Sequence, residues 1–368
     1  MAYALARRNL RGDPVGIAGI IEKEARIDQR RRKHSLALRR ISRGWHDLAD
    51  IGGPAADMAR SLLARRYADS RFRQGRLDEA LLWAERAARY AEESVDKFSL
   101  AGAYEVLNHI YAGSGRDEPL PYGRLALQAY TELGDLRHQG WCLNNLAMQD
   151  FGAGRWNESL AKFRQATGLF QRIGDTAAEG NAIYNEAEIL VRQRRYAEAR
   201  DLLTDVLRIA RAVEDDELVA LAQREMARVL GGSGDADRAV SLVRDAHARF
   251  ATLGEPSEVW ATDLALVEIL QQADRSGEAG EALELLGEPT GPRATYDRLT
   301  AHQHLADGRP DEARSVLAVA LAAAEEEADR LEQGLILHEL AGLTEEHDRH
   351  RAERRAGEVL DSIGVVRP

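Results

Sequence analysis

The chain has 368 residues, of which 30% are charged and 44% hydrophobic, and its formal net charge is −11. This composition is ordinary for a soluble folded protein, and no stretch approaches the roughly 20 consecutive apolar residues that a membrane-spanning helix needs. The single cysteine, Cys142, excludes a disulfide framework and a cysteine-based zinc site, and we expect it to be a packed core residue in a reducing, cytoplasmic setting.

Charge is distributed unevenly along the chain. Residues 1–50 contain 12 basic and 6 acidic side chains, a local charge of +6, so the remainder carries −17. An acidic body of this kind argues against direct nucleic-acid binding. The basic run at residues 30–33 can in principle contact phosphate, but a solvated helix face is the favoured interpretation. Residues 1–10 lack the apolar segment of a secretory signal, so we expect no export and no membrane partner.

A short turn motif recurs along the chain and predicts helices in pairs. Its form is Gly-x-Tyr/Trp-x-Glu-Ala, with variations, at 75–80, 154–159, 194–199, 234–239 and 308–313. The residue that closes each motif, with two weaker copies included, falls at 37, 80, 159, 199, 239, 279 and 313. The repeating unit is therefore about 40 residues long in the middle of the chain.

Helix ends recur with the same period. The acidic residues that close four similar tetrads stand at 135, 175, 215 and 255, each 40 residues after the last. The glycine that precedes three of them suits the position after a helix, where the backbone turns left-handed. The acidic residue suits the start of the next helix, because a carboxylate there satisfies free N–H groups and the helix dipole.

Between these signals each unit is predicted to form two amphipathic helices. After the turn motif, apolar residues recur at helical spacing, as in Ala199, Leu203, Val206 and Ala210. Twelve residues before each motif ends, the first helix carries a small residue, at positions 25, 68, 147, 187, 227 and 301. Small residues at a crossing let two helix axes approach closely, so this column has a packing reason.

These signals predict eight helix pairs and a C-terminal capping pair. The expected segments are a leader at 1–17, repeats at 18–60, 61–99, 100–139, 140–179, 180–219, 220–259, 260–293 and 294–328, and capping helices at 329–368. The third repeat has a degenerate turn that contains Pro119 and Pro121.

The small residue, the turn motif and the apolar ladder together resemble the tetratricopeptide repeat (TPR). That resemblance implies an all-α fold, a right-handed superhelical solenoid of helix-turn-helix repeats. The period of 40 exceeds the usual 34; HEAT repeats have the longer period but lack the turn motif. Lengthened repeats of this kind resemble those of bacterial signalling ATPase regulators.

The chain is also similar to the C-terminal repeat region of actinobacterial class III nucleotide cyclase proteins. The similarity rests on residues 132–135, Gly140, 143–147 and 154–156, and on the tail at 363–366. In those proteins a cyclase domain and a P-loop ATPase domain precede the repeats. The resemblance therefore implies a stand-alone relative, or the C-terminal regulatory arm of such a protein without its catalytic domains.

The sequence lacks the motifs that assemble a catalytic centre. No lysine follows a glycine, which excludes a Walker A phosphate loop, and 231–235 resembles a helix-ending turn more than a nucleophile elbow. His302 and His304 point to different helix faces, and His347 and His350 share a face without a third ligand nearby. We therefore expect no enzymatic activity, no cofactor and no metal, and neither ATP hydrolysis nor cyclic-nucleotide synthesis.

The first helix of each pair lines the concave side of such a solenoid. Its expected groove-facing positions carry aromatic, amide and basic side chains, which supply contact area and hydrogen-bonding groups for a peptide. These candidates are Tyr104, Asn108, Tyr111, Trp141, Asn144, Asn145, Met148, Asn181, Tyr184, Asn185, Arg224 and Arg228. The alternative is that the asparagines cap or bridge neighbouring helices.

Chaperone-type repeat proteins clamp a C-terminal carboxylate with two asparagines and two basic residues. Asn108 and Asn145 match the asparagine pair, but Asn181 and Asn185 stand where the basic residues belong. The resemblance therefore does not extend to a carboxylate clamp.

The favoured function is a non-catalytic interaction scaffold that binds a peptide, a partner protein or its own missing catalytic domains in the groove. The alternative is an effector-sensing solenoid that encloses a small molecule or peptide, and a third hypothesis is an enzyme. The oligomeric state stays open.

We expect Tyr184→Ala and Trp141→Ala to abolish partner binding without changing the melting curve, and Arg31→Ala to have little effect on partner binding. Because each repeat contacts only its neighbours, deletion of 180–219 is expected to leave a folded chain.

Overall fold

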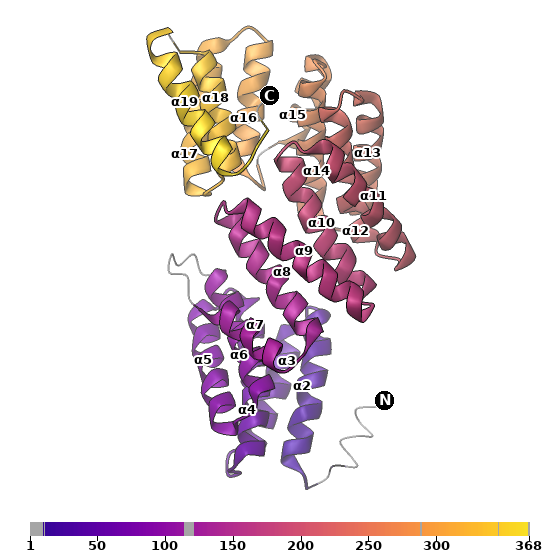
Figure 1. Cartoon of the computed structure of the whole chain (residues 1–368), viewed down its shortest axis with the longest axis vertical. Coiled ribbons are helices and arrows are strands. Elements are labelled where there is room, and N and C mark those ends of the chain that lie inside the picture. Colours follow the sequence, from indigo (N-terminus) through magenta and orange to yellow (C-terminus); the bar gives the residue numbers. More distant parts are fainter. Residues whose placement is uncertain (1–9, 11, 114–120, 288, 345, 367–368) are drawn as a thin grey trace. The chain divides into compact units, whose positions relative to one another are not determined.

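The computed structural model describes residues 10, 12–113, 121–287, 289–344 and 346–366, without the side chains of 346–348 (Figure 1). The secondary structure of these residues is helical, with no strand among them. The prediction of an all-α fold is thereby confirmed. Pro119 of the degenerate third turn lies outside the described residues, and Pro121 directly precedes a helix.

The helices alternate along the chain as the first and second members of the pairs. The first helices are α2 (Pro14–Arg30), α4 (Pro54–Phe72), α6 (Lys97–Ala112), α8 (Leu136–Gly152), α10 (Thr176–Arg192), α12 (Asp216–Gly232), α14 (Pro256–Gln272) and α16 (Arg293–Ala306). The second helices are α3 (His34–Asp47), α5 (Leu77–Ser94), α7 (Tyr122–Glu132), α9 (Trp156–Ile173), α11 (Tyr196–Ala212), α13 (Ala236–Leu253), α15 (Ser276–Leu286) and α17 (Pro310–Glu326). The C-terminal pair is α18 (Arg330–Gly342) and α19 (Glu346–Ser362).

The chain divides into two compact units, Met1–Asn145 and Leu146–Pro368, with the boundary inside α8. We call them the N-terminal and the C-terminal unit. None of the described helices is long and apolar enough to cross a membrane.

Several helices begin earlier than the expected repeat boundaries. The helices α8, α10, α12 and α14 begin at 136, 176, 216 and 256, and so the boundaries drawn at 140, 180, 220 and 260 fall inside them. Likewise α2 begins within the expected leader and α4 before residue 60. The boundaries were counted from the turn motif, whereas the helix start is set by the residue that caps it.

The predicted helix ends are present. Asp175 and Asp215 cap α10 and α12, since their side chains accept hydrogen bonds from the backbone N–H groups of Ala178 at 3.3 Å and Leu218 at 3.0 Å. Gly174 follows α9 in the left-handed conformation, with φ of 66°, as expected for glycine after a helix. Glu214 occupies the same position of the next repeat with φ of 57°, although it carries a side chain.

The column of small residues forms the helix crossings in both units. The alanines at 25, 68, 147, 187, 227 and 301 are all 0% exposed. Each lies in a hydrophobic cluster between the helices of its own pair and of the next pair. Burial of these methyl groups and of the apolar ladders around them supplies the main stabilisation of both units.

The C-terminal tail packs against a helix far away in the sequence. The side chain of Gln193, at the end of α10, donates to the carbonyl of Ile363 at 2.8 Å, and the backbone N–H of Val366 donates to the carbonyl of Gln193 at 3.0 Å. Leu360, Ile363 and Val365 join the same buried cluster as Leu190. The expectation that each repeat contacts only its neighbours is therefore wrong for the C-terminal unit, whose last segment contacts one of its first helices.

Candidate functional site

The first helices of the C-terminal unit form a continuous face. Neighbouring members of the series α10, α12, α14, α16 and α18 pack against one another. Positions 40 residues apart in the longer repeats occupy equivalent places on this face, which we call the first-helix face. Side chains at equivalent positions can therefore meet across adjacent helices.

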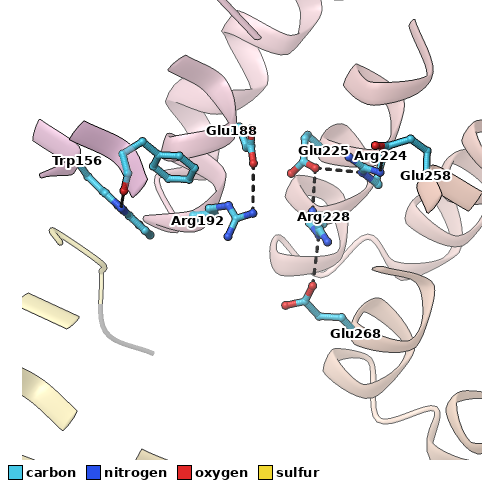
Figure 2. Close-up of polar contacts among 9 residues, drawn as sticks. Trp156, Glu188, Arg192, Arg224, Glu225, Arg228, Glu258 and Glu268 are labelled. Atoms are coloured by element: carbon cyan, nitrogen blue, oxygen red, sulfur yellow. Dashed lines mark hydrogen bonds and ion pairs between the residues drawn. The ribbon is translucent and has the colours of Figure 1, made fainter. Parts of the chain in front are cut away.

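Ion pairs lie on the first-helix face of α10, α12 and α14: one pair lies within α10, and a connected set joins α12 to α14 (Figure 2). Arg228 of α12 contacts Glu225 at 2.8 Å on its own helix and Glu268 of α14 at 3.3 Å. Arg192 contacts Glu188 at 3.2 Å on α10, where the two side chains are one turn apart. We call this set, together with Arg224 and Glu258, the ion-pair relay.

A second arginine of α12 completes the relay. Arg224 contacts Glu258, at the start of α14, at 2.7 Å and the neighbouring Glu225 at 3.4 Å. It also interacts with the hydroxyl of Tyr184 on α10. Three successive helices are thus joined through the two arginines of α12.

Glu225 is the central anion of the relay, and it is only 1% exposed. Burial by itself disfavours its charged form, but Arg228, Arg224 and Arg192 together hold the pKa of the carboxyl below its usual value. The same arrangement raises the pKa of Arg228, because Glu225 and Glu268 outweigh the cost of burying the guanidinium. Glu225 is therefore ionised at neutral pH and fixes the orientation of Arg224 and Arg228, which it contacts.

A related cluster lies further along the same face. Arg298 of α16 binds Glu332 of α18 through two nitrogen atoms, at 2.6 and 3.2 Å, and approaches Glu339 at 3.5 Å. Arg298 and Glu332 are both buried. Burial dominates at Glu339 and raises the pKa of its carboxyl.

Three of the predicted site residues come together in the C-terminal unit. Tyr184 lies beside Arg224 and belongs to the relay together with Arg228. Tyr184 is only 7% exposed and is part of the hydrophobic core. Burial first, and then Glu188 and Glu225, raise the pKa of its hydroxyl. The expectation that Tyr184→Ala leaves the melting curve unchanged is therefore wrong, because removing a buried ring of this size costs about 3–5 kcal/mol.

The other predicted residues of this unit are placed differently. Asn181 donates from its side chain to the carbonyl of Ala177 at 2.8 Å, one turn earlier on the same helix, so this hydrogen bond is neither a helix cap nor a bridge to a neighbouring helix. Asn185 is half-buried on α10, and Met148 on α8 is exposed.

The remaining six predicted residues belong to the N-terminal unit. Tyr104 and Tyr111 of α6 both stack on Tyr122, the first residue of α7, with ring centroids 5.9 and 5.7 Å apart. Asn108, Trp141 and Asn145 are half-buried, and Asn144 is buried. The single groove expected across the residues of both units stays a prediction.

Several residues of the face were missed from the sequence. Arg192, Glu258, Glu268, Arg298 and Glu332 were absent from the predicted site. The sequence does contain a signal for Glu268. Residues 188, 228 and 268 are each 40 residues apart, and their charges alternate: Glu188 is negative, Arg228 positive and Glu268 negative. Opposite charges at equivalent positions of adjacent repeats indicate a ladder of ion pairs.

The described residues contain no group of three histidine, cysteine or acidic side chains placed to hold a metal ion. Cys142 is buried, as predicted, and burial raises the pKa of its thiol, which keeps the sulfur protonated and unreactive.

Residues 179–252 match the family model of the tetratricopeptide repeat. This match covers most of α10 and all of α11 and α12, together with most of α13. No curated protein matches the chain in sequence.

Solved structures show the same fold over nearly the whole chain. A Rap protein complexed with Competence and Sporulation Factor is 13% identical, with a TM-score of 0.61 over 95% of this chain and 98% of that one. Aspartyl phosphate phosphatase F from Bacillus subtilis is 12% identical, with a TM-score of 0.60 over 95% and 96%. A STAND signal-transduction ATPase with a tetratricopeptide repeat sensor, from Pyrococcus horikoshii, is 15% identical, with a TM-score of 0.51 over 96% of this chain and 47% of that one.

The chain thus has a TPR-type helical repeat fold, as its turn motif and apolar ladder predicted. The resemblance to repeats of signalling ATPases is confirmed at the level of the fold. The similarity to cyclase-associated repeats stays a prediction.

Proposed function

We propose that the chain is a non-catalytic regulatory scaffold that binds a peptide, or an extended segment of a partner protein, on the first-helix face of its C-terminal unit. Structures with the same fold include a Rap protein complexed with Competence and Sporulation Factor. The ion-pair relay is the observation that carries the proposal.

The relay presents ordered polar groups at the surface. Glu188 and Arg192 keep 22% and 34% of their side-chain surface, and Arg228 and Glu268 keep 26% each. The buried Glu225 holds Arg228 from below. These four groups alternate between donors and acceptors, as the N–H and C=O groups of a peptide backbone do. Because their orientations are already fixed, binding costs little side-chain entropy.

The charges of the relay largely cancel. A ligand therefore needs no strong net charge, and its affinity is expected to depend only weakly on salt, unlike capture of phosphate or carboxylate groups.

The test begins with peptides selected from a random display library against the full chain, measured by fluorescence anisotropy. We expect Arg192→Ala and Glu268→Ala each to weaken binding about tenfold or more, as residues near the centre of an interface do. Arg208→Ala is the matched control, because this arginine of α11 is exposed and, among the described residues, forms an ion pair with Asp205 alone, one turn away. Loss of binding in the control, or unchanged binding in both relay variants, would place the peptide elsewhere.

Tyr184→Phe separates binding from folding better than Tyr184→Ala. It keeps the buried ring and removes only the hydroxyl that meets Arg224. We expect a small loss of stability and a measurable loss of affinity.

We propose further that the chain has no catalytic activity of its own, because its sequence lacks the motifs that assemble a catalytic centre, a Walker A loop among them. One protein of the same fold is named a phosphatase. The assays are therefore hydrolysis of ATP, of an aspartyl-phosphate substrate, and cyclic-nucleotide synthesis by the purified chain. A turnover that follows the protein through purification would overturn this part of the proposal.

The packing of the tail on α10 favours a second candidate function. A C-terminal unit whose ends meet can enclose an effector. Native mass spectrometry of the purified chain decides this, because an enclosed molecule adds a defined mass.

A further inference from the structure

The N-terminal unit contains a basin of arginines that the proposed function does not use. It is a cavity of about 720 Å³ between the end of α2, the start of α3 and the second half of α4. Its lining includes Arg26, Arg30, Arg32, His34, Arg66 and Arg73. We call it the arginine basin. The four residues of the run at 30–33 are exposed, as expected of a solvated face, and two of them, Arg30 and Arg32, line the basin.

The positive charge of the basin is only partly balanced. Arg66 contacts Glu22 at 2.6 Å, and Arg73 contacts Asp69 at 3.1 Å. Within the described parts of the chain, no acidic side chain pairs with Arg26 or Arg30. These two arginines lie one turn apart on α2, where like charges destabilise a helix.

The backbone at the edge of the basin is also suited to an anion. Lys33 precedes α3 and makes no side-chain capping hydrogen bond, and the first turn of α3 has no acidic residue. The first turn of α3, which begins at His34, therefore keeps the positive end of the helix dipole, and no side chain of its own helix neutralises it. The side-chain Nδ1 of His34 is buried without a hydrogen-bond partner among the described residues.

The floor of the basin is rigid. Gln29 is 7% exposed, and its side-chain nitrogen donates to the carbonyl of Arg66 at 2.7 Å and to the hydroxyl of Ser70 at 2.9 Å. This contact fixes α2 against α4, and so it fixes the spacing of the arginines that the two helices carry.

We propose that the arginine basin binds a small molecule through a chain of two or three linked phosphate groups. The planar guanidinium binds phosphate oxygens through two parallel hydrogen bonds, and several guanidinium groups around one cavity match several phosphates. A cavity of this volume lies within the usual range for small-molecule sites. A nucleic-acid strand requires a basic track that continues across the surface, and the rest of the chain is acidic.

The test is isothermal titration calorimetry of the full chain with orthophosphate, pyrophosphate, tripolyphosphate and ATP, without divalent metal. We expect affinity to rise with the number of linked phosphates and to fall as salt is added. The double variant Arg26→Gln and Arg30→Gln is expected to lose at least tenfold in affinity for tripolyphosphate. Arg31→Gln is the matched control, because Arg31 belongs to the same basic run, is exposed and lies outside the basin lining.

Thermal unfolding without ligand checks that the variants fold. Removal of the unbalanced charges is expected to leave the melting temperature of the double variant unchanged or higher. Tripolyphosphate should raise the melting temperature of the wild type and of Arg31→Gln, and should raise that of the double variant much less.

The relative affinities for these ligands decide whether the site exists and which molecule supplies the phosphates. Tighter binding of ATP than of tripolyphosphate identifies a nucleotide as the source of the phosphates, and equal or weaker binding of ATP identifies the phosphate chain alone; both support the site. Absence of binding, equal affinity for orthophosphate, or equal loss in Arg31→Gln overturns it. Binding of an RNA oligonucleotide that tripolyphosphate does not displace would assign the basin to nucleic acid and also overturn the proposal.

Discussion

At the scale of single residues, Glu225 shows how a buried charge is tolerated in a repeat protein. Three arginines surround it, and two of them reach carboxylates on the next helix. A buried ion pair is often no more stable than apolar packing, but removing one partner leaves the others uncompensated. The relay is therefore sensitive to loss of its central anion.

We expect Glu225→Gln to lower the free energy of unfolding by about 3 kcal/mol at neutral pH. Because the pKa of Glu225 is lowered in the folded state, its contribution is present above the usual value of 4.5 and is lost as pH falls below it. The difference between wild type and variant should therefore shrink in acid, as measured by urea unfolding. Asp205→Asn, in an exposed pair, is the control and should change little.

Glu339 is predicted to behave in the opposite way. Burial raises the pKa of its carboxyl, and its Oε2 is buried without a hydrogen bond among the described residues. The ionised form therefore costs stability at neutral pH, and Glu339→Gln should raise the melting temperature there. This gain disappears as pH falls to the usual value of 4.5, where the wild-type carboxyl is protonated. Glu332 binds the same Arg298 through both of its oxygen atoms, so Glu332→Gln should instead lower the melting temperature. A lower melting temperature in both variants would contradict the conclusion that the charge of Glu339 is destabilising.

At the scale of helices, the turn after α9, α11 and α13 recurs with the same left-handed conformation but with different residues. Gly174 and Gly254 adopt the left-handed conformation, and Glu214 adopts it between them in the sequence. A side chain in this conformation costs about 1 kcal/mol.

Glu214→Gly is therefore expected to stabilise the chain by about 0.5–1 kcal/mol, seen as a higher midpoint of urea unfolding. Arg211→Gly, three residues earlier inside α11, provides the contrast. A glycine within a helix should cost about 1 kcal/mol, so the two substitutions are expected to have opposite signs. Destabilisation by both would show that Glu214 makes a compensating contact.

The helices and their ends could be predicted from the sequence because the signals are local. The Asp175 cap, the Gly174 turn and the alanine column each depend on residues within one or two turns. The relay was only partly predictable: Arg224 and Arg228 were identified by their position, but their partners Glu258 and Glu268 lie one repeat later. The burial of Tyr184 was missed, because a position counted as groove-facing also contacts the neighbouring helix.

At the scale of the C-terminal unit, the contact between the tail and α10 has no counterpart in the repeat pattern. Gln193 and Ile363 are 170 residues apart, and no periodicity connects them. The contact also changes the expectation for deletion of 180–219. That segment contains Gln193, so its removal eliminates the docking position of the tail as well as one repeat.

Docking of the tail depends on a glycine. Gly364 has φ of 74°, and a Cβ atom there would lie 2.8 Å from the side-chain nitrogen of Gln193. Gly364→Ala therefore combines backbone strain with a clash, and we expect it to release the tail and expose Leu360, Ile363 and Val365 from the core. Hydrogen exchange should then accelerate at the end of α19 and at the end of α10, while the circular dichroism spectrum stays helical, because the other helix pairs still pack on their neighbours.

Gly342→Ala is the matched control for this release, because Gly342 has no positive φ and an added Cβ would meet nothing within 4 Å. It should leave exchange at both places unchanged. If Gly364→Ala leaves exchange at the end of α10 unchanged while accelerating it in α19 alone, the tail does not hold α10. The two ends of the C-terminal unit would then be stabilised independently, and the case for an enclosed effector would lose its structural basis.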